Sequence, residues 1–159
     1  MTHERHEAHQ YRAVVAWRGN TASGYDAYDR THTGACPPAN AALTLSADPA
    51  FLGDAASLNP EQLLVLAAAS CQLLSFLAVA ARARIDVREY DDAAVASMPD
   101  EPLPMSIRAI NLRPRITVAP GTDAARVLHL CDVAHRECYI ANSLSCPVTV
   151  VATVRVADD

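Results

Sequence analysis

Two cysteines hold the chemistry that this sequence suggests first: Cys71, in the middle of an apolar stretch, and Cys138, near the other end of the chain. Sixty-seven residues separate them, so only folding can bring them together. A thiol that is oxidised to a sulfenic acid, with a second thiol able to reach it, is the minimum for a cycle that closes a disulfide. A thiol in an apolar helix is more often a packing residue, and this alternative stays open for Cys71.

A nucleophilic cysteine must be a thiolate, which needs a nearby cation because apolar burial alone raises the pKa of a thiol. Arg18 and Arg30 lie in or beside an expected N-terminal hairpin, and either is a candidate or a solvated strand charge. Glu61 could hold such a guanidinium by a bidentate pair, or it could be a first-turn acid favoured by the helix dipole. Ten helical residues separate Glu61 from Cys71 by about 15 Å along the axis, so either a long arginine bridges them or the helix begins later than residue 60.

A second kind of site is suggested by Cys131, His135 and Cys138, whose spacing places all three on one face of a helix. Thiolate and imidazole are ligands for a soft metal such as zinc. The set lacks a fourth ligand and a CxxC pair, and a packing or capping role for His135 is the alternative. Cys36 and Cys146 each precede a proline, and their positions imply no partner.

The composition limits the class of protein. A chain of 159 residues and 17.0 kDa predicts a single domain over residues 1–159, with residues 1–9 as a flexible N-terminus. A net charge of −5 and scattered arginines argue against a nucleic-acid binder. The polar first twenty residues lack the apolar core of a secretory signal, so we expect a cytoplasmic protein with five reduced cysteines.

The order of elements predicts an α+β fold. Turn residues and β-branched runs predict an N-terminal hairpin, and Asn59-Pro60 and Thr122-Asp123 predict the starts of two helices. The predicted strands cover residues 11–17, 25–32, 42–46, 85–90, 93–98, 106–118 and 147–156; the helices cover residues 60–84 and about 124–138. The strands at 85–118 are expected to be antiparallel neighbours, with the helices on one face of a sheet.

The first of these helices raises the question of a membrane, because residues 63–81 carry no charge. Six of these nineteen residues are alanine, and Ser70, Gln72 and Ser75 interrupt the apolar surface. We therefore expect a helix buried in a core or between subunits, and no membrane partner.

The motif Asn59-Pro60-Glu61-Gln62-Leu63 with Cys71, followed by Ala134-His135-x-x-Cys138 and Asn142, resembles the OsmC/Ohr family of organic hydroperoxide reductases. Tyr28-Asp29-Arg30-Thr31-His32 and the segment 46–54 suggest a less characterised OsmC-like branch of this family.

The resemblance implies an intertwined homodimer, with antiparallel sheets around two long central helices and active sites at the subunit interface. It implies Cys71 as the peroxidatic thiolate, Cys138 as the resolving thiol, Glu61 as the acid that orients an arginine, and Arg30 as that arginine. The Gly-Gly-Arg turn of the Ohr branch is absent, so Arg18 stays an alternative to Arg30.

From this resemblance we expect a thiol-dependent peroxidase of the oxidative stress response. It would reduce organic hydroperoxides to alcohols without a bound cofactor and draw electrons from an external, lipoyl-type dithiol. The other hypothesis is a non-catalytic dimer on the same scaffold, which would bind a metal at Cys131, His135 and Cys138 or a hydrophobic small ligand.

Overall fold

The computed structural model describes residues 8–158. These form two compact units, with the boundary at Gln62, in the first turn of helix α1 (Pro60–Arg82). Most of the N-terminus expected to be flexible, residues 1–7, lies outside the described part of the chain.

The first unit contains a three-stranded antiparallel sheet, in the order β1 (Val14–Ala16), β2 (His32–Ala35) and β3 (Ala42–Leu45). The strands predicted at 11–17 and 42–46 are confirmed. The strand predicted at 25–32 is wrong, because this segment forms turns and β2 begins only at His32. The long connection from β1 to β2 therefore carries Tyr25, Tyr28 and Arg30 as loop residues.

The segment between β3 and α1 is fixed by local hydrogen bonds. The Asp48 side chain accepts from the Ala50 backbone N–H at 2.8 Å and caps the short helix η1 (Pro49–Phe51). Gly53 lies so close to the Ala47 carbonyl that any Cβ there would collide with backbone. At the start of α1, Asn59 Oδ1 accepts from the Gln62 N–H at 2.8 Å, and Gln62 Oε1 accepts from the Asn59 N–H at 3.0 Å. This reciprocal cap fixes where the helix begins.

The second unit packs helices against two three-stranded sheets. One sheet has the order β4-β7-β9 and the other β5-β6-β8. The strands are β4 (Val87–Asp92), β5 (Val95–Ser97), β6 (Ala109–Leu112), β7 (Pro114–Val118), β8 (Val148–Val150) and β9 (Thr153–Val156). The antiparallel pairs β4/β7 and β5/β6 confirm the expected neighbours. The expectation of antiparallel sheets throughout is wrong, because β8 pairs parallel to β6 and β9 parallel to β7.

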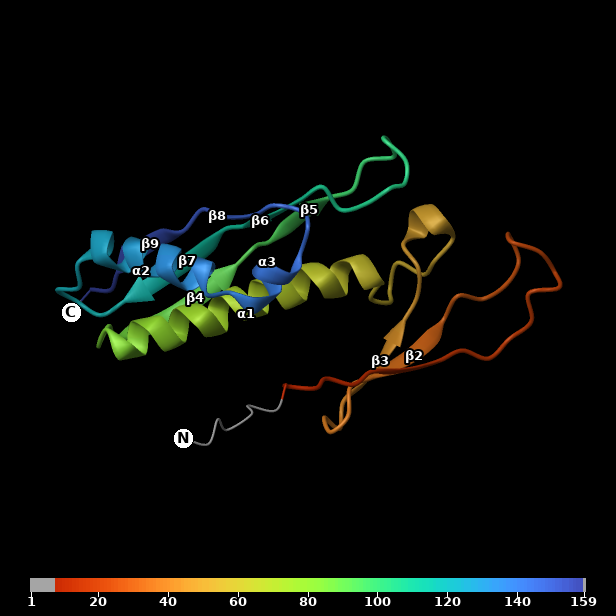
Figure 1. Ribbon diagram of the computed structural model, residues 1–159, viewed down its shortest axis with the longest axis horizontal. Helices are drawn as coiled ribbons and strands as arrows, with labels where there is room; N and C mark the ends of the chain where they lie inside the picture. The colour runs from red at the N-terminus through yellow and green to blue at the C-terminus, as the bar shows by residue number, and fades with distance from the viewer. Residues whose placement is uncertain (1–7, 159) are drawn as a thin grey trace, which may run out of the picture. The chain divides into compact units, whose positions relative to one another are not determined.

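Each of the two long strands predicted at 106–118 and 147–156 is interrupted and passes from one sheet to the other. The first break lies at Arg113, whose backbone N–H donates to Asp92 Oδ1 at 2.7 Å. The next residue, Pro114, has no N–H with which to form a hydrogen bond between strands. The second break lies between Val150 and Thr153. It is next to the first break, because β8 pairs with β6 and β9 pairs with β7. Figure 1 shows both strands continuing past these breaks side by side.

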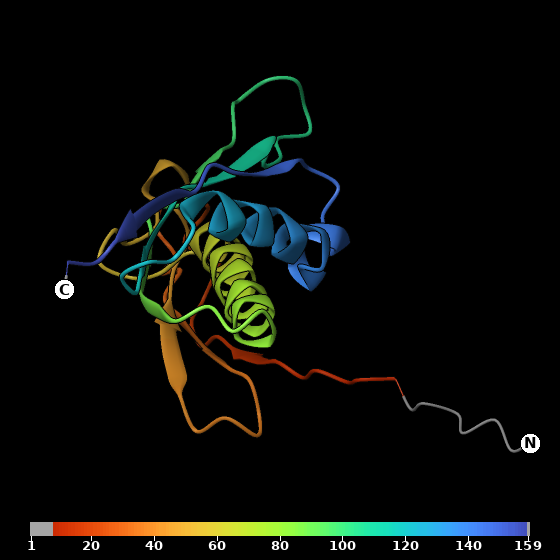
Figure 2. The ribbon, with the colours of Figure 1, turned by 90° about the vertical axis from the view of Figure 1, so that its left-hand side faces the viewer.

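Helices α1 and α2 (Ala124–Arg136) lie on the same side of the sheets, as Figure 2 shows in the view along the long axis of Figure 1. Asp123 caps α2 as predicted, with its side chain accepting from the Ala125 N–H at 2.9 Å. The main core lies between the two helices and β7, and is formed by Phe76, Val79, Ala80, Ile116, Val118, Val127, Cys131 and Ala134. The helix predicted through Cys138 ends two residues earlier, at Arg136. A separate short helix, α3 (Tyr139–Ser143), follows.

Helix α1 ends at Arg82, two residues before the predicted end, and Arg84 takes a positive φ of 58° in the turn that follows. By length and composition, α1 is the one helix within residues 8–158 that could cross a membrane. Its fully buried Gln72 donates a hydrogen bond to the Cys131 carbonyl of α2 at 3.3 Å. Such polar packing against a second helix is what a core helix requires.

Candidate active site

Cys71 lies halfway along α1 and is half-buried at the wall of a groove of about 410 Å³. The residues of α1 that line this groove recur every three or four positions, so they form one stripe along the helix. They are Ala67, Ser70, Cys71, Leu74, Ser75, Ala78 and Arg82. The sulfur of Cys71 therefore faces an open, largely apolar channel.

Cys138 is fully buried in the turn between α2 and α3 and lies against Cys71. Burial raises the pKa of the Cys138 thiol, and the neighbouring Cys71 thiol raises this pKa further, while the Ala141 and Ile140 backbone N–H groups oppose the rise. The Ile140 N–H donates to Cys71 Sγ at 3.5 Å. The structure thus brings together the two cysteines that the sequence places sixty-seven residues apart.

Asn142 holds the turn that carries Cys138. Its side-chain Nδ2 donates to the Arg136 carbonyl at 2.9 Å and to the Cys138 carbonyl at 3.0 Å. Its backbone N–H also donates to the Cys138 carbonyl, at 3.0 Å. The turn therefore keeps its shape after α2 has ended, and the Cys138 side chain stays directed at α1.

An ion pair at the end of the groove was missed by the sequence reasoning. Arg82 Nη2 lies 3.2 Å from Glu137 Oε2, and both residues line the groove. The signal was present: Arg82 follows Cys71 by eleven residues, or about three helical turns, and so falls on the same face. Both side chains are more than half exposed, which limits the strength of this pair.

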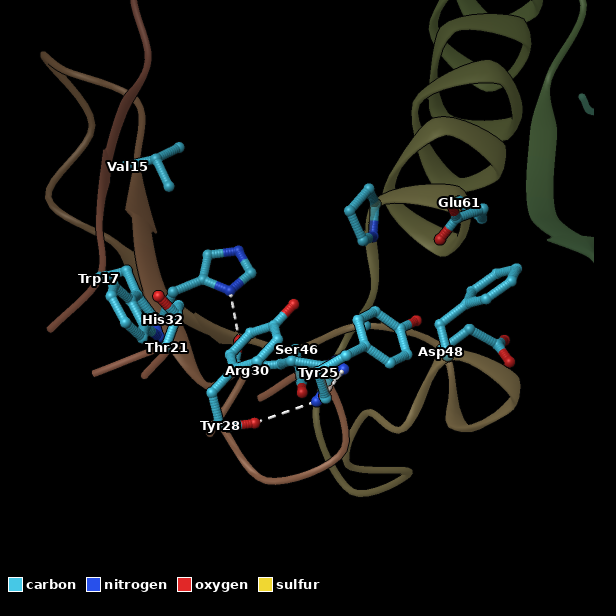
Figure 3. Close-up of a pocket in the computed structure, with 13 residues that line it drawn as sticks. Val15, Trp17, Thr21, Tyr25, Tyr28, Arg30, His32, Ser46, Asp48 and Glu61 are labelled. Carbon is cyan, nitrogen blue, oxygen red and sulfur yellow. Dashed lines mark hydrogen bonds between the residues drawn. The ribbon is translucent and has the colours of Figure 1, made fainter. Parts of the chain in front are cut away.

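Arg30 and Glu61 line a different cavity, of about 550 Å³, which belongs entirely to the first unit (Figure 3). Arg30 is only 8% exposed. Its guanidinium carbon lies 4.0 Å from the centre of the Tyr28 ring and 4.7 Å from that of the Tyr25 ring. The same guanidinium donates to the Tyr28 carbonyl at 3.0 Å and to the Tyr25 carbonyl at 2.7 Å. The cation is therefore held by its own loop.

Glu61 stands on the first turn of α1 at the other wall of this cavity. Within residues 8–158 it makes no ion pair with Arg30, so the bidentate pair considered from the sequence is not formed there. Arg18 is exposed, donates to the Trp17 carbonyl at 2.9 Å, and does not line the cavity. Of the two candidate arginines, Arg30 is the one that shares a cavity with Glu61.

The other three cysteines, Cys36, Cys131 and Cys146, do not line the groove that Cys71 lines. Cys131 is buried beside Gln72, and burial raises the pKa of its thiol to about 11, against a hydrogen bond from Gln72 that lowers it. In the part of the chain that the structure describes, no three His, Cys, Asp or Glu side chains converge on a possible metal position. The set Cys131, His135 and Cys138 is therefore not assembled, because α2 ends before Cys138 and its thiol turns to Cys71. Cys36 is exposed and Cys146 half-buried.

Comparisons with known proteins identify the family of this chain. The family model described as OsmC-like protein matches residues 53–153, and the chain belongs to this family. A comparison with curated proteins found no match.

Several solved structures share the fold. An OsmC-like protein of unknown function from Vibrio cholerae is 26% identical with a TM-score of 0.83, covering 92% of this chain and 100% of that one. An organic hydroperoxide resistance protein OsmC from Legionella pneumophila is 19% identical with a TM-score of 0.68, covering 94% and 99%. An organic hydroperoxide resistance protein from Elizabethkingia anophelis is 16% identical with a TM-score of 0.70, covering 96% and 99%. These last two likenesses concern the fold.

Proposed function

We propose that the protein is a thiol-dependent peroxidase that reduces organic hydroperoxides to alcohols. The observation that carries this proposal is the contact between Cys71, which opens onto a groove, and Cys138, which is fully buried. A peroxide that enters the groove can reach the Cys71 sulfur, and the buried Cys138 sulfur lies beside it. The names of the structurally similar hydroperoxide resistance proteins point the same way.

In the proposed reaction the Cys71 thiolate attacks the outer oxygen of ROOH, and the O–O bond breaks. The alkoxide takes a proton and leaves as ROH, and Cys71 becomes a sulfenic acid. The Cys138 sulfur then attacks Cys71, the S–O bond breaks, water leaves and a disulfide forms. An external dithiol, of the lipoyl type that the family resemblance suggests, reopens the disulfide by exchange. The apolar lining from Ala67, Leu74 and Ala78 favours an organic peroxide over hydrogen peroxide.

We assign the charge stabilisation in this reaction to Arg30, with Glu61 as the acid of the same cavity. The assignment follows the family resemblance and is supported by the burial of Arg30 and by the cavity that both residues line. We also propose that residues 1–159 act as one functional domain and that the protein is cytoplasmic.

One equivalent of cumene hydroperoxide should remove two of the five free thiols of the reduced protein. A sulfenic acid that closes onto a second thiol consumes both, and titration with a thiol reagent under denaturing conditions counts what is left. The Cys138→Ser variant should lose one thiol and the Cys71→Ser variant none. An unchanged thiol count in the wild type would contradict the peroxidase proposal.

That last outcome would favour the second candidate, a non-catalytic small-ligand protein. The cavity of the first unit supports it, because Trp17, Tyr25, Tyr28 and Phe51 give it an aromatic lining of the kind that binds small molecules.

We also propose that the protein works as a homodimer whose two long helices are central. Helix α1 leaves Leu66 57% and Leu77 39% exposed, which is unusual for a helix of such apolar composition. Sedimentation equilibrium should give a mass of twice 17.0 kDa.

The Leu66→Glu variant should sediment as a monomer, because a buried carboxylate opposes association. The matched control is Leu103→Glu, at a loop residue that is 78% exposed, which should leave the mass unchanged. A wild-type mass of 17.0 kDa at micromolar concentration would contradict the dimer.

A further inference from the structure

The cavity of the first unit concentrates the aromatic side chains of this chain. The sequence has five tyrosines, two phenylalanines and one tryptophan, and half of these line this one cavity. They are Trp17, Tyr25, Tyr28 and Phe51. The cavity measures about 550 Å³, which falls in the range of about 300–1,000 Å³ that is typical of small-molecule sites. The reaction proposed above uses only Arg30 and Glu61 of its lining.

Three of these rings meet edge to face. The Trp17 and Tyr28 ring centres are 6.3 Å apart at an interplanar angle of 89°, and those of Tyr25 and Tyr28 are 6.3 Å apart at 72°. Aromatic rings prefer this arrangement, because the positive edge of one ring faces the negative face of the next. An aryl group bound in the cavity can extend the pattern, which an aliphatic group cannot.

Hydrogen bonds within the connection from β1 to β2 hold this lining in place. Trp17 Nε1 donates to the Asp29 carbonyl at 2.7 Å, and the Thr31 N–H donates to Asp29 Oδ1 at 2.8 Å. The ring nitrogen Nδ1 of His32 lies 2.9 Å from the Arg30 carbonyl oxygen. The lining is therefore formed before a ligand arrives, so a ligand does not have to order it.

The charged groups of the cavity favour an uncharged ligand that directs an oxygen at Arg30. Asp48 and Glu61 line the cavity together with Arg30, and Figure 3 shows Glu61 on the opposite side from Trp17. A ligand with its own carboxylate would meet like charges there. The Arg30 guanidinium carries more N–H donors than the two that bond to backbone carbonyls, so a ligand oxygen can accept from the others.

The proposed reaction requires the organic group of the peroxide to lie near Arg30. Arg30 is assigned above to the alkoxide that departs when the O–O bond breaks, and the organic group is bonded to that same oxygen. We propose that the cavity of the first unit binds the organic group of the hydroperoxide, and that its aromatic lining selects uncharged arylalkyl hydroperoxides over aliphatic and carboxylate-bearing ones. This inference rests on the peroxidase function proposed above and names the substrate class of that function.

Binding to the cavity can be measured without any reaction. Trp17 is the one tryptophan of the sequence, so tryptophan emission reports on this cavity. The probe is 2-phenyl-2-propanol, the alcohol that forms when cumene hydroperoxide is reduced, and tert-butanol is the aliphatic comparison. We expect 2-phenyl-2-propanol to give a saturable change in Trp17 emission. Its half-saturation concentration should be on the order of tenfold or more below that of tert-butanol.

Selection should also appear in the kinetics of the wild type. We expect kcat/KM for cumene hydroperoxide to exceed that for tert-butyl hydroperoxide by on the order of 10- to 100-fold. Each value is first divided by the rate constant of the same peroxide with free dithiothreitol, which removes differences in intrinsic reactivity. Cumene hydroperoxide with a carboxylate on its ring should react on the order of tenfold less well than the parent compound, because Asp48 and Glu61 oppose its charge.

The Phe51→Leu variant tests the lining directly, because it removes a ring and keeps an apolar side chain. The kcat/KM for cumene hydroperoxide should fall about three- to tenfold more than that for tert-butyl hydroperoxide. A purely structural role for Phe51 would lower both values equally. The matched control is Tyr11→Leu, which removes a 91% exposed ring of the same unit outside the cavity and should change neither value. Where Phe51→Leu fails to fold, Tyr25→Leu gives the same test at a residue that is 61% exposed.

The results that would overturn this inference can be told apart from a failure of the peroxidase proposal. Trp17 emission that does not saturate with 2-phenyl-2-propanol, or equal normalised kcat/KM values for the two peroxides, overturns aromatic selection and leaves the peroxidase function standing. An unchanged ratio of these values in Phe51→Leu and Tyr25→Leu does the same. Failure of every peroxide to remove thiols from the wild type overturns the peroxidase function and this inference with it, even where the alcohol binds.

Discussion

Replacing Cys71 by serine is expected to lower the rate of organic hydroperoxide reduction by on the order of 10⁴-fold or more. A serine hydroxyl is not ionised at neutral pH and is a poor nucleophile toward peroxide oxygen, so the first step has no attacking group. The measurement is consumption of cumene hydroperoxide with dihydrolipoamide as the reductant. The substitution changes one atom in a half-buried position, so the variant should fold normally.

The matched controls for this experiment are other cysteines of the same chain. Cys36→Ser alters an exposed thiol in the first unit and Cys146→Ser a half-buried thiol of the second, and both should keep wild-type activity. Retention of activity by Cys71→Ser, or an equal loss in all three variants, would rule out Cys71 as the reacting group.

Replacing Arg30 by glutamine is expected to lower kcat/KM by about 10²- to 10³-fold, or about 3–4 kcal/mol of transition-state stabilisation. The guanidinium is the buried cation of the cavity that it shares with Glu61. In the proposed reaction its positive charge would stabilise the negative charge that develops on the departing alkoxide. Arg30→Lys should recover little, because an ammonium group cannot reproduce the fork that donates to two carbonyls between two rings. Steady-state kinetics on both variants provide the measurement.

Two further arginines serve as controls. Arg18→Gln removes an exposed charge that does not line the cavity and should leave kcat/KM unchanged. Arg82→Gln removes the partly exposed cation of the groove and should cost only a few-fold, as for other exposed ion pairs. A large loss in Arg82→Gln with full activity in Arg30→Gln would transfer the role to Arg82. Thermal melting of each variant separates a catalytic loss from unfolding, which matters most for the buried Arg30.

Local signals in the sequence located the starts of α1 and α2 correctly. Asn59 and Asp123 accept hydrogen bonds from the first turns of α1 and α2, and such caps depend only on residues that are close in sequence. For the same reason the helix that carries Cys71 could be predicted, along with the strands of most of the second unit. The end of α2 was predicted too late because the break at Glu137 depends on Asn142, which bonds back to the Arg136 carbonyl from beyond the helix.

Features that depend on distant residues could not be predicted in the same way. Alternation of apolar residues is the same in parallel and antiparallel strands. The parallel pairing of β8 with β6 and of β9 with β7 therefore left no signal in the sequence. Gln72 could be recognised only as an isolated polar residue in an apolar helix, because its partner Cys131 is fifty-nine residues away. The contact of Cys71 with Cys138 was suggested by family resemblance, since no spacing rule brings these residues together.

The parallel pairing of β8 with β6 and of β9 with β7 also determines when Cys71 and Cys138 come together during folding. The segment with Cys138 is a crossover that enters from β7 and leaves into β8, so it is secured only after residues 148–156 have joined β6 and β7. Contacts between residues so far apart form late, because the intervening chain must first be closed into a loop. On the ribosome, residues 1–147 are synthesised before these strands exist. A nascent chain therefore carries Cys71 before Cys138 is held beside it, and we expect it to become competent for the proposed redox cycle only when synthesis has passed β9.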